Sequence, residues 1–514
     1  MFILSEDSER TRGDDAQSSN ISAGKAVSES VRTTLGPRGM DKMLVSDDGD
    51  VVITNDGATI LDEMDIEHPA AQMLVEVAET QEEEVGDGTT TASILAGELL
   101  SQAEDLLEDD VHPTTIVEGY HEAARIAQDA IEDNVIATDP DDEQLLQVAN
   151  SSMTGKGTGE LAAGDLAQTV VDAVSGISTE AGVDRDRITV HTQVGAATSA
   201  TELVEGVIVD EDRLSEEMPR AVEDAAIAIV EEDLEVKESN IDAEYQVSNV
   251  DQLNAAIEAE TEQLAEYAAA IAETDADVVF IDGDVDDRVA SDLVKEGLLV
   301  FDGVDGDDIT AIGAATGASR VGSVDTLENA DLGSAESVSV EKFADEELVF
   351  IEGGAASEAV TVFARGSTEH VVDEIERSLN DALDVVTAAL DAGGVVAGAG
   401  AIEITIADRI RDEAASIEGR KQLAVEAYAD AVDVIPRTLA ENTGMDPIDA
   451  LVDLRAEHDS GTPAGLISEG QTGVVDDPIE YGVLDPAAVK REAVDSATEA
   501  STMIVRIDDV IASN

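Results

Sequence analysis

The chain has 514 residues, 43% of them hydrophobic, so it is long enough for about two to four domains with sizeable cores and is not an acidic disordered tail. Its 117 acidic residues against 28 basic ones give a formal net charge of -89, which argues against nucleic-acid binding, because phosphate recognition needs clustered lysine and arginine. The absence of cysteine excludes disulfides, thiolate zinc sites and cysteine nucleophiles.

The first residues of the chain, MFILSED, lack the basic region and the long apolar run of a signal peptide. No run along the chain approaches the roughly 18 apolar residues that a membrane-spanning helix needs. We therefore expect a cytoplasmic protein without membrane contact.

The N-terminal part of the chain has mainly helical patterning. Val27, Val31 and Leu35 repeat at helical spacing, and the Gly36-Pro37 pair predicts the end of that helix. Residues 51–54 (VVIT) predict a strand, and the NDG sequence that follows predicts a tight turn. A second helical stretch begins at Pro69, and apolar residues on one face predict a long helix over 92–107.

The middle of the chain has short β-rich runs between helical patterns, which favours an α/β domain. The runs are 207–209, 226–230, 278–281 and 298–301. Residues 238–265 form an unusually polar segment within this region. From about residue 370 helical patterning dominates again, so two helix-rich ends flank a mixed middle.

The segment Gly86–Thr91 (GDGTTT) carries the strongest chemical signal. Glycines let backbone N–H groups approach an oxyanion, and the following helix start adds free N–H donors and a favourable dipole. Hydroxyls can bind phosphate oxygens, and an aspartate beside phosphates suits Mg²⁺. The alternative is an ordinary helix start after a flexible turn. The spacing is not that of a Walker loop.

Further segments make the signal specific, because together they resemble the motifs of the archaeal-type (group II) chaperonins, of the kind found in salt-loving archaea. They occur in the family's order and cover nearly the whole chain. They are TTLGPRGMD (33–41), TNDGATI (54–60), VGDGTT (85–90), TGKG (154–157), NDAL (380–383), GAGAIE (398–403), VIPRTLAEN (434–442) and RIDD (506–509).

The resemblance implies a multidomain α+β chaperonin fold. The helical equatorial domain would comprise 1–142 and 394–514, and the small intermediate domain would comprise 143–207 and 362–393. The α/β apical domain would be 208–361, with a helical protrusion near 238–265 that serves as a built-in lid. Subunits would assemble, as homo- or hetero-oligomers, into two stacked rings that enclose non-native proteins.

The resemblance also assigns roles around ATP and Mg²⁺. Asp87 would hold Mg²⁺, while Asp56 and Asp381 would orient and activate the attacking water. The nucleotide itself would be bound by Leu35, Gly36, Pro37, Gly88, Thr89, Thr90, Thr91, Lys156, Gly398, Ala399, Gly400, Gly465, Leu466 and Asp485. Phosphoryl transfer depends mainly on such positioning and charge neutralisation.

Each role has an ordinary alternative. Asp56 is also a typical turn residue, and Asp381 is also one more acid on a helix face. Lys156 would contact the γ-phosphate as a point charge, or it is a solvent-facing loop lysine. The apolar residues of the 238–265 segment would meet clients or neighbouring protrusions, or they pack against their own helix.

Two residues depart from the family pattern. Ala399 stands where the family has the second of three glycines, and alanine is poor at positive φ. Either this position has an ordinary backbone conformation, or nucleotide affinity is reduced. Ile467 stands where the group II pattern often has asparagine.

The expected function is therefore an ATP-driven folding machine. One alternative is a passive holdase or structural ring subunit with degraded ATPase, which Ala399 favours and the retained aspartates oppose. Another is a small-molecule kinase or ligase, for which no second substrate motif is found. The acids are spread along the chain, which favours adaptation to concentrated salt over capture of a cationic partner.

Overall fold

The computed structural model describes residues 8–46, 49, 51–155, 160–179, 182–236, 250–343, 346–354, 359–469 and 472–513. They form two compact units: Met1–Val174 with Thr179–Arg185 and Glu369–Asn514, and Asp186–Thr368 with Ser175–Ser178. No helix in the described ranges is long and apolar enough to cross a membrane. The division into equatorial, intermediate and apical domains stays a prediction.

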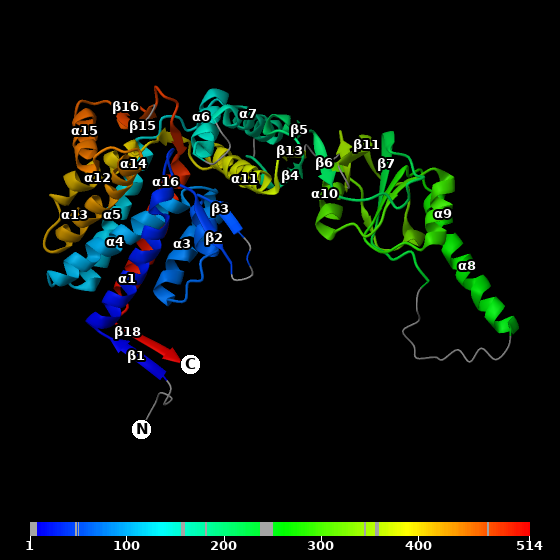
Figure 1. Ribbon diagram of the computed structural model, residues 1–514, viewed down its shortest axis with the longest axis horizontal. Coiled ribbons are helices and arrows are strands. Elements are labelled where there is room, and N and C mark those ends of the chain that lie inside the picture. The colour runs from blue at the N-terminus through cyan, green and yellow to red at the C-terminus, as the bar shows by residue number, and fades with distance from the viewer. Residues whose placement is uncertain are drawn as a thin grey trace. The chain divides into compact units, whose positions relative to one another are not determined.

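The first unit is mainly helical and combines both ends of the chain (Figure 1). Its helices are α1 (Asp14–Val31), α2 (Gly57–Asp62), α3 (Pro69–Val85), α4 (Thr89–Glu108), α5 (Pro113–Asp133), α6 (Asp142–Met153), most of α7 (Glu160–Ile177), α11 (Glu369–Asp391), α12 (Ala401–Ala414), α13 (Lys421–Val432), α14 (Val434–Asn442), α15 (Pro447–Asp459) and α16 (Ala487–Val505). Their apolar faces form one core, in which Tyr120 and Tyr428 are fully buried and meet edge to face.

Short antiparallel strand pairs connect the helices of this unit. They are β1 (Ser8–Arg12) with β18 (Asp509–Ser513), β2 (Lys42–Val45) with β3 (Val51–Thr54), β14 (Val395–Ala397) with β17 (Leu484–Pro486), and β15 (Gly465–Glu469) with β16 (Thr472–Asp476). The β1–β18 pair brings the two chain ends together, and Arg10 forms an ion pair with Asp509 across it. The β14–β17 pair joins segments about 90 residues apart at the site described below.

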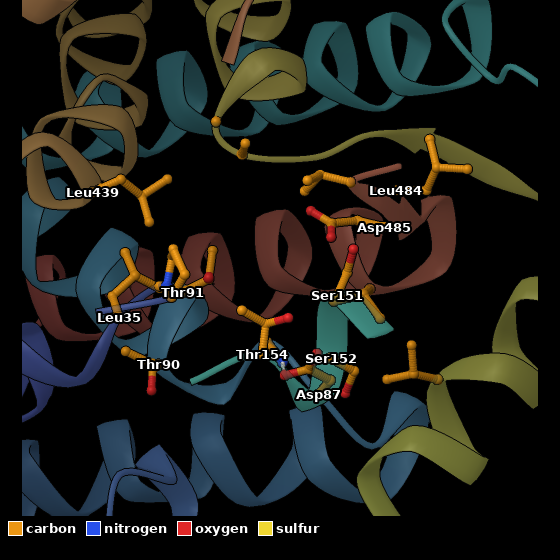
Figure 2. Close-up of a pocket in the computed structure, with 18 of the residues that line it drawn as sticks. Leu35, Asp87, Thr90, Thr91, Ser151, Ser152, Thr154, Leu439, Leu484 and Asp485 are labelled. Carbon is orange, nitrogen blue, oxygen red and sulfur yellow. Dashed lines mark hydrogen bonds between the residues drawn. The ribbon is translucent and has the colours of Figure 1, made fainter. Parts of the chain in front are cut away.

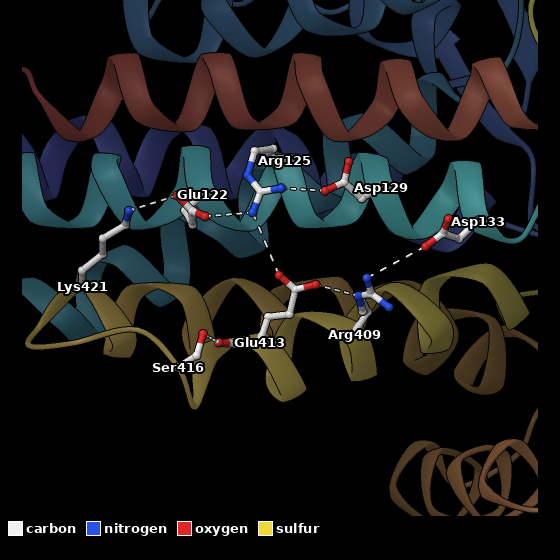
Figure 3. Close-up of polar contacts among 8 residues, drawn as sticks. All are labelled: Glu122, Arg125, Asp129, Asp133, Arg409, Glu413, Ser416 and Lys421. Carbon is white, nitrogen blue, oxygen red and sulfur yellow. Dashed lines mark hydrogen bonds and ion pairs between the residues drawn. The ribbon is translucent and has the colours of Figure 1, made fainter.

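Ion pairs connect the surfaces of α5, α12 and α13 (Figure 3). Arg125 on α5 binds Glu122 at 2.9 Å and Asp129 at 2.6 Å, and Glu122 also accepts from Lys421 at 3.2 Å. Arg409 on α12 binds Glu413 at 2.7 Å. Both arginines here meet more than one acid, which offsets part of the local negative charge.

The second unit is α/β, as the sequence predicts. A seven-stranded sheet has the order β6-β12-β11-β7-β8-β9, with β10 beside β7. Its strands are β6 (Gly206–Val209), β7 (Ala221–Val230), β8 (Val278–Ile281), β9 (Leu299–Phe301), β10 (Arg320–Val321), β11 (Gly333–Phe343) and β12 (Glu346–Glu352). The parallel strands β8 and β9 are completely buried, which explains their continuous apolar sequences.

Helices and a smaller sheet complete the second unit. The helices are α8 (Val250–Ala272), α9 (Asp287–Glu296) and α10 (Gly306–Thr316). The smaller sheet has the order β4-β13-β5, from Ile188–Val194, Val360–Gly366 and Glu202–Val204. The polar segment 238–265 lies partly outside the described residues, and its part from Val250 onward is helical.

Most of the elements that the sequence predicts are confirmed, and one is wrong. The first long helix ends at Val31 and a 3₁₀ turn, Arg32–Thr34, carries the chain to Gly36 and Pro37. The NDG sequence does not form the tight turn that the sequence predicts. Asp56 instead caps α2, because its Oδ2 accepts a hydrogen bond from the Thr59 N–H at 2.7 Å.

Candidate nucleotide-binding site

A turn between α3 and α4 presents Asp87. Gly86 ends α3 with φ +67°, and Gly88 precedes α4 with φ +85°. Side chains would not fit at either position, since a Cβ on Gly86 would lie 2.1 Å from the Asp384 Cβ. The Gly88 N–H donates to the Asp87 Oδ1 at 2.7 Å and so orients the carboxylate.

Helix α4 directs its free N–H groups toward the same place. The first turn of the helix consists of Thr89, Thr90 and Thr91, whose backbone N–H groups have no intrahelical acceptors. Thr89 Oγ1 donates to the Asp56 Oδ1 at 3.4 Å, which links the first residue of α4 to the cap of α2. The structure therefore brings Asp56, Asp87 and a helix N-terminus to one cavity, an arrangement suited to phosphate and a divalent cation.

The segment Leu35–Pro37 forms another wall of the cavity. Gly36 has φ +87° and lies so close to Leu439 of α14 that an added Cβ would be 2.4 Å from its Cδ2. Asn442, also on α14, donates to the Leu35 carbonyl at 2.8 Å and fixes the loop. Leu35 and Leu439 supply an apolar surface on which a flat base can pack.

The cavity has a volume of about 460 Å³, within the range of small-molecule sites (Figure 2). The C-terminal end of α6 and the residue that follows it line the cavity with Asn150, Ser151, Ser152 and Thr154. Ser152 is buried, and its Oγ has no hydrogen-bond partner among the described residues. An orphaned buried hydroxyl in a cavity wall favours a polar ligand, because an unsatisfied group costs about 1–3 kcal/mol.

Asp485 lies on β17 and faces the cavity together with Lys490 of α16. The Lys490 Nζ is 2.7 Å from the Asp485 Oδ2 and 2.8 Å from the Glu403 Oε1. Burial alone would lower the pKa of Lys490, but the two carboxylates outweigh it and raise the pKa well above its ordinary value. Sequence reasoning missed Lys490, because only the fold brings it between these acids.

Ala399 resolves one alternative that the sequence leaves open. Its φ is +55°, so the backbone at this position is left-handed and not ordinary. Gly400 beside it has φ +83°, and the Ala399 carbonyl accepts from the Leu466 N–H at 2.8 Å. The alanine thus occupies a strained conformation in the cavity wall.

The remaining residues that the sequence singles out differ in how they relate to the cavity. Gly398 and Gly465 do not line the cavity but support it, since a Cβ on Gly465 would lie 2.9 Å from the Ala399 Cβ. Asp381 is buried on α11 and is not a lining residue, although Val385, one turn later, is. Lys156 lies outside the described residues. Ile467 lines the cavity with Leu466.

The protein does not supply a complete metal cage here. No group of three or more histidine, aspartate or glutamate side chains that could hold a metal is found in the described part of the chain. Mg²⁺ commonly binds to one or two carboxylates and completes its shell with phosphate oxygens and water. Asp87 and the turn at Gly86–Gly88 fit that kind of site.

Comparisons with known proteins place the whole chain in one family. A model of the TCP-1/cpn60 chaperonin family matches residues 27–514. Thermosome subunit 3 of Haloferax volcanii is 62% identical over 515 residues, which cover 100% of this chain and 98% of that protein. Thermosome subunit alpha of Halobacterium salinarum and thermosome subunit 1 of Haloferax volcanii are each 53% identical, over 100% of this chain and 91% of each relative.

Proposed function

The chain belongs to the TCP-1/cpn60 chaperonin family and is an ATP-dependent chaperonin that assists protein folding, and from this premise we propose that the cavity of its helical unit is the ATPase site. The observation that carries the proposal is the meeting of Asp56, Asp87 and the N-terminus of α4 in one cavity. The family binds ATP; the Mg²⁺ requirement and the residue roles below are part of the proposal.

The N–H groups of Thr89–Thr91 and their hydroxyls bind the phosphate oxygens, while Leu35 and Leu439 hold the base. Mg²⁺, when bound, would supply charge neutralisation. Asp87 would hold the ion, and the Gly88 N–H keeps its carboxylate oriented. Asp56, fixed by the Thr59 N–H, holds water in line with the γ-phosphate and accepts its proton. Asp485 accepts hydrogen bonds from the ribose hydroxyls.

Asp381 completes the site after a movement of α11. Its side chain is buried and does not line the cavity, whereas Val385 on the same helix does. A shift of α11 on ATP binding brings the carboxylate to the attacking water, so hydrolysis follows closure. Lys156 and Gly398–Gly400 complete the nucleotide contacts.

The proposed assembly is a double ring of such subunits, homomeric or heteromeric. Chaperonins of this kind form oligomeric rings and act on non-native proteins. We assign equatorial, intermediate and apical domains as the sequence predicts, with the 238–265 segment as the lid. We propose that the protein works in a cytoplasm of high salt concentration, because concentrated salt screens the repulsion within a chain of net charge -89.

The test is ATP hydrolysis in molar KCl with Mg²⁺, with size-exclusion chromatography in parallel. The wild type is expected to hydrolyse ATP as a ring-sized species. Asp381→Ala should keep nucleotide binding and lose hydrolysis. Loss of binding in this variant would refute the proposed role, and a ring without hydrolysis by the wild type would favour a passive subunit.

A further inference from the structure

Gln81 lies beneath the phosphate-binding turn and is fully buried on α3. Its Nε2 donates to the Asp87 carbonyl at 2.8 Å and to the Val489 carbonyl of α16 at 3.3 Å. Both partners are acceptors, so the amide nitrogen has to face them. One side chain therefore connects the turn that carries Asp87 with the first turn of α16.

Close packing around Gly88 restricts the conformations that the Asp87–Gly88 turn can adopt. A Cβ on Gly88 would lie 2.7 Å from the Val489 Cγ1 and 2.9 Å from the Gln81 Nε2. The turn thus rests directly on Gln81 and on the first turn of α16. The next residue of that helix is Lys490, which holds Asp485 on the other side of the cavity.

If Gln81 served only to fill space, its amide would destabilise the fold compared with an apolar side chain. The Gln81 Oε1 has no hydrogen-bond partner among the described residues, and a buried acceptor without a partner destabilises the folded state. A methionine of similar length would fill the same space without that cost. What the amide adds is a double donor aimed at two carbonyls.

We propose that Gln81 is a positioning residue that fixes the Asp87–Gly88 turn against α16 and so holds the Asp87 carboxylate where Mg²⁺–nucleotide needs it. The inference rests on the proposed role of Asp87. The carboxylate is oriented by the Gly88 N–H at one end of the residue, and the carbonyl is held by Gln81 at the other. With both ends held, the carboxylate is preorganised before the nucleotide arrives.

The test is equilibrium binding of ADP by calorimetry, with and without Mg²⁺, in molar KCl. Gln81→Met keeps the volume and removes the donor. We expect the gain in ADP affinity on adding Mg²⁺ to fall by about tenfold, the effect of losing roughly one buried hydrogen bond, with Mg²⁺-free affinity nearly unchanged. Gln81→Leu is the second variant, with the same expectation, because its apolar side chain also lacks a donor.

Gln128→Met is the matched control. Gln128 likewise donates to a carbonyl of α16, that of Arg491 at 2.9 Å, but it does not line the cavity, so the gain should be unchanged. Melting temperatures of all variants identify any loss of folded protein. The inference would be overturned if Gln81→Met kept the whole gain in ADP affinity on adding Mg²⁺, or if its ADP affinity fell equally with and without Mg²⁺.

Asp87→Asn separates the inference from the proposed function. If this variant loses the Mg²⁺-dependent gain while the Gln81 variants keep it, the positioning role is wrong and the role of Asp87 stands. If Asp87→Asn keeps the gain, the metal role of Asp87 is wrong, and the inference falls with it.

Discussion

Replacing Ala399 with glycine should stabilise the protein. The residue has φ +55°, a region that costs an alanine roughly 1–2 kcal/mol relative to right-handed backbone. Glycine has no such penalty, but its greater freedom in the unfolded chain returns about 0.4–1 kcal/mol. The expected net gain in the free energy of unfolding is therefore about 0.8 kcal/mol, the middle of a range of about 0–1.6 kcal/mol. ADP affinity should stay the same or rise, because the cavity wall loses only one methyl group.

The assay is urea denaturation in molar KCl followed by circular dichroism, with ADP binding measured on the same samples. Ala407→Gly is the matched control, because Ala407 is a buried residue in the interior of α12, where glycine should cost about 1 kcal/mol. The two substitutions should have opposite signs. If Ala399→Gly destabilises the protein as Ala407→Gly does, the backbone at 399 is not strained.

Two further predictions concern buried charge. Lys490→Met removes the cation between Asp485 and Glu403 and should lower the free energy of unfolding, measured by urea denaturation, by about 3–5 kcal/mol. Lys421→Met, at a more exposed ion pair, should lower it by less than about 1 kcal/mol. Equal losses in the two variants would contradict this reasoning. Burial, and then repulsion by nearby carboxylates, raises the pKa of Glu211 from 4.5 to about 7. Its contribution to stability is therefore complete below about pH 4.5 and is lost as the pH rises through about 7. Glu211→Gln should reduce the fall in melting temperature over that window, and an unchanged slope would show that Glu211 is not its source.

The sequence predicts those parts of the site that depend on local backbone chemistry. The glycines and threonines of 86–91 have to form a turn and a helix start because of their own conformational preferences, and they do so. The buried strands β8 and β9 are equally clear, since such continuous apolar runs are typical of parallel strands that are covered on both faces of a sheet.

Other parts depend on contacts between distant segments, which the sequence does not predict. Lys490 looks like any exposed helix lysine until β17 and α12 place Asp485 and Glu403 beside it. Gln81 is polar within an acidic stretch, and its burial follows only from the packing of α3 against α16. The NDG sequence is a strong local signal for a turn, yet α2 begins there and uses Asp56 as its cap.

Salt separates two classes of ion pair in this chain. At about 1 M salt the Debye length is roughly 3 Å, close to the 2.9 Å between Arg125 and Glu122, so screening weakens such surface pairs. Buried or partly buried pairs are screened much less. Arg213–Glu347 is buried, and in Arg411–Asp433 the aspartate is buried while the arginine is partly exposed. Dilution of salt strengthens the surface pairs but also the repulsion among 117 acids that only 28 basic residues oppose. Loss of stability on dilution would therefore show that this repulsion outweighs the ion pairs, since ion pairing alone has the opposite sign.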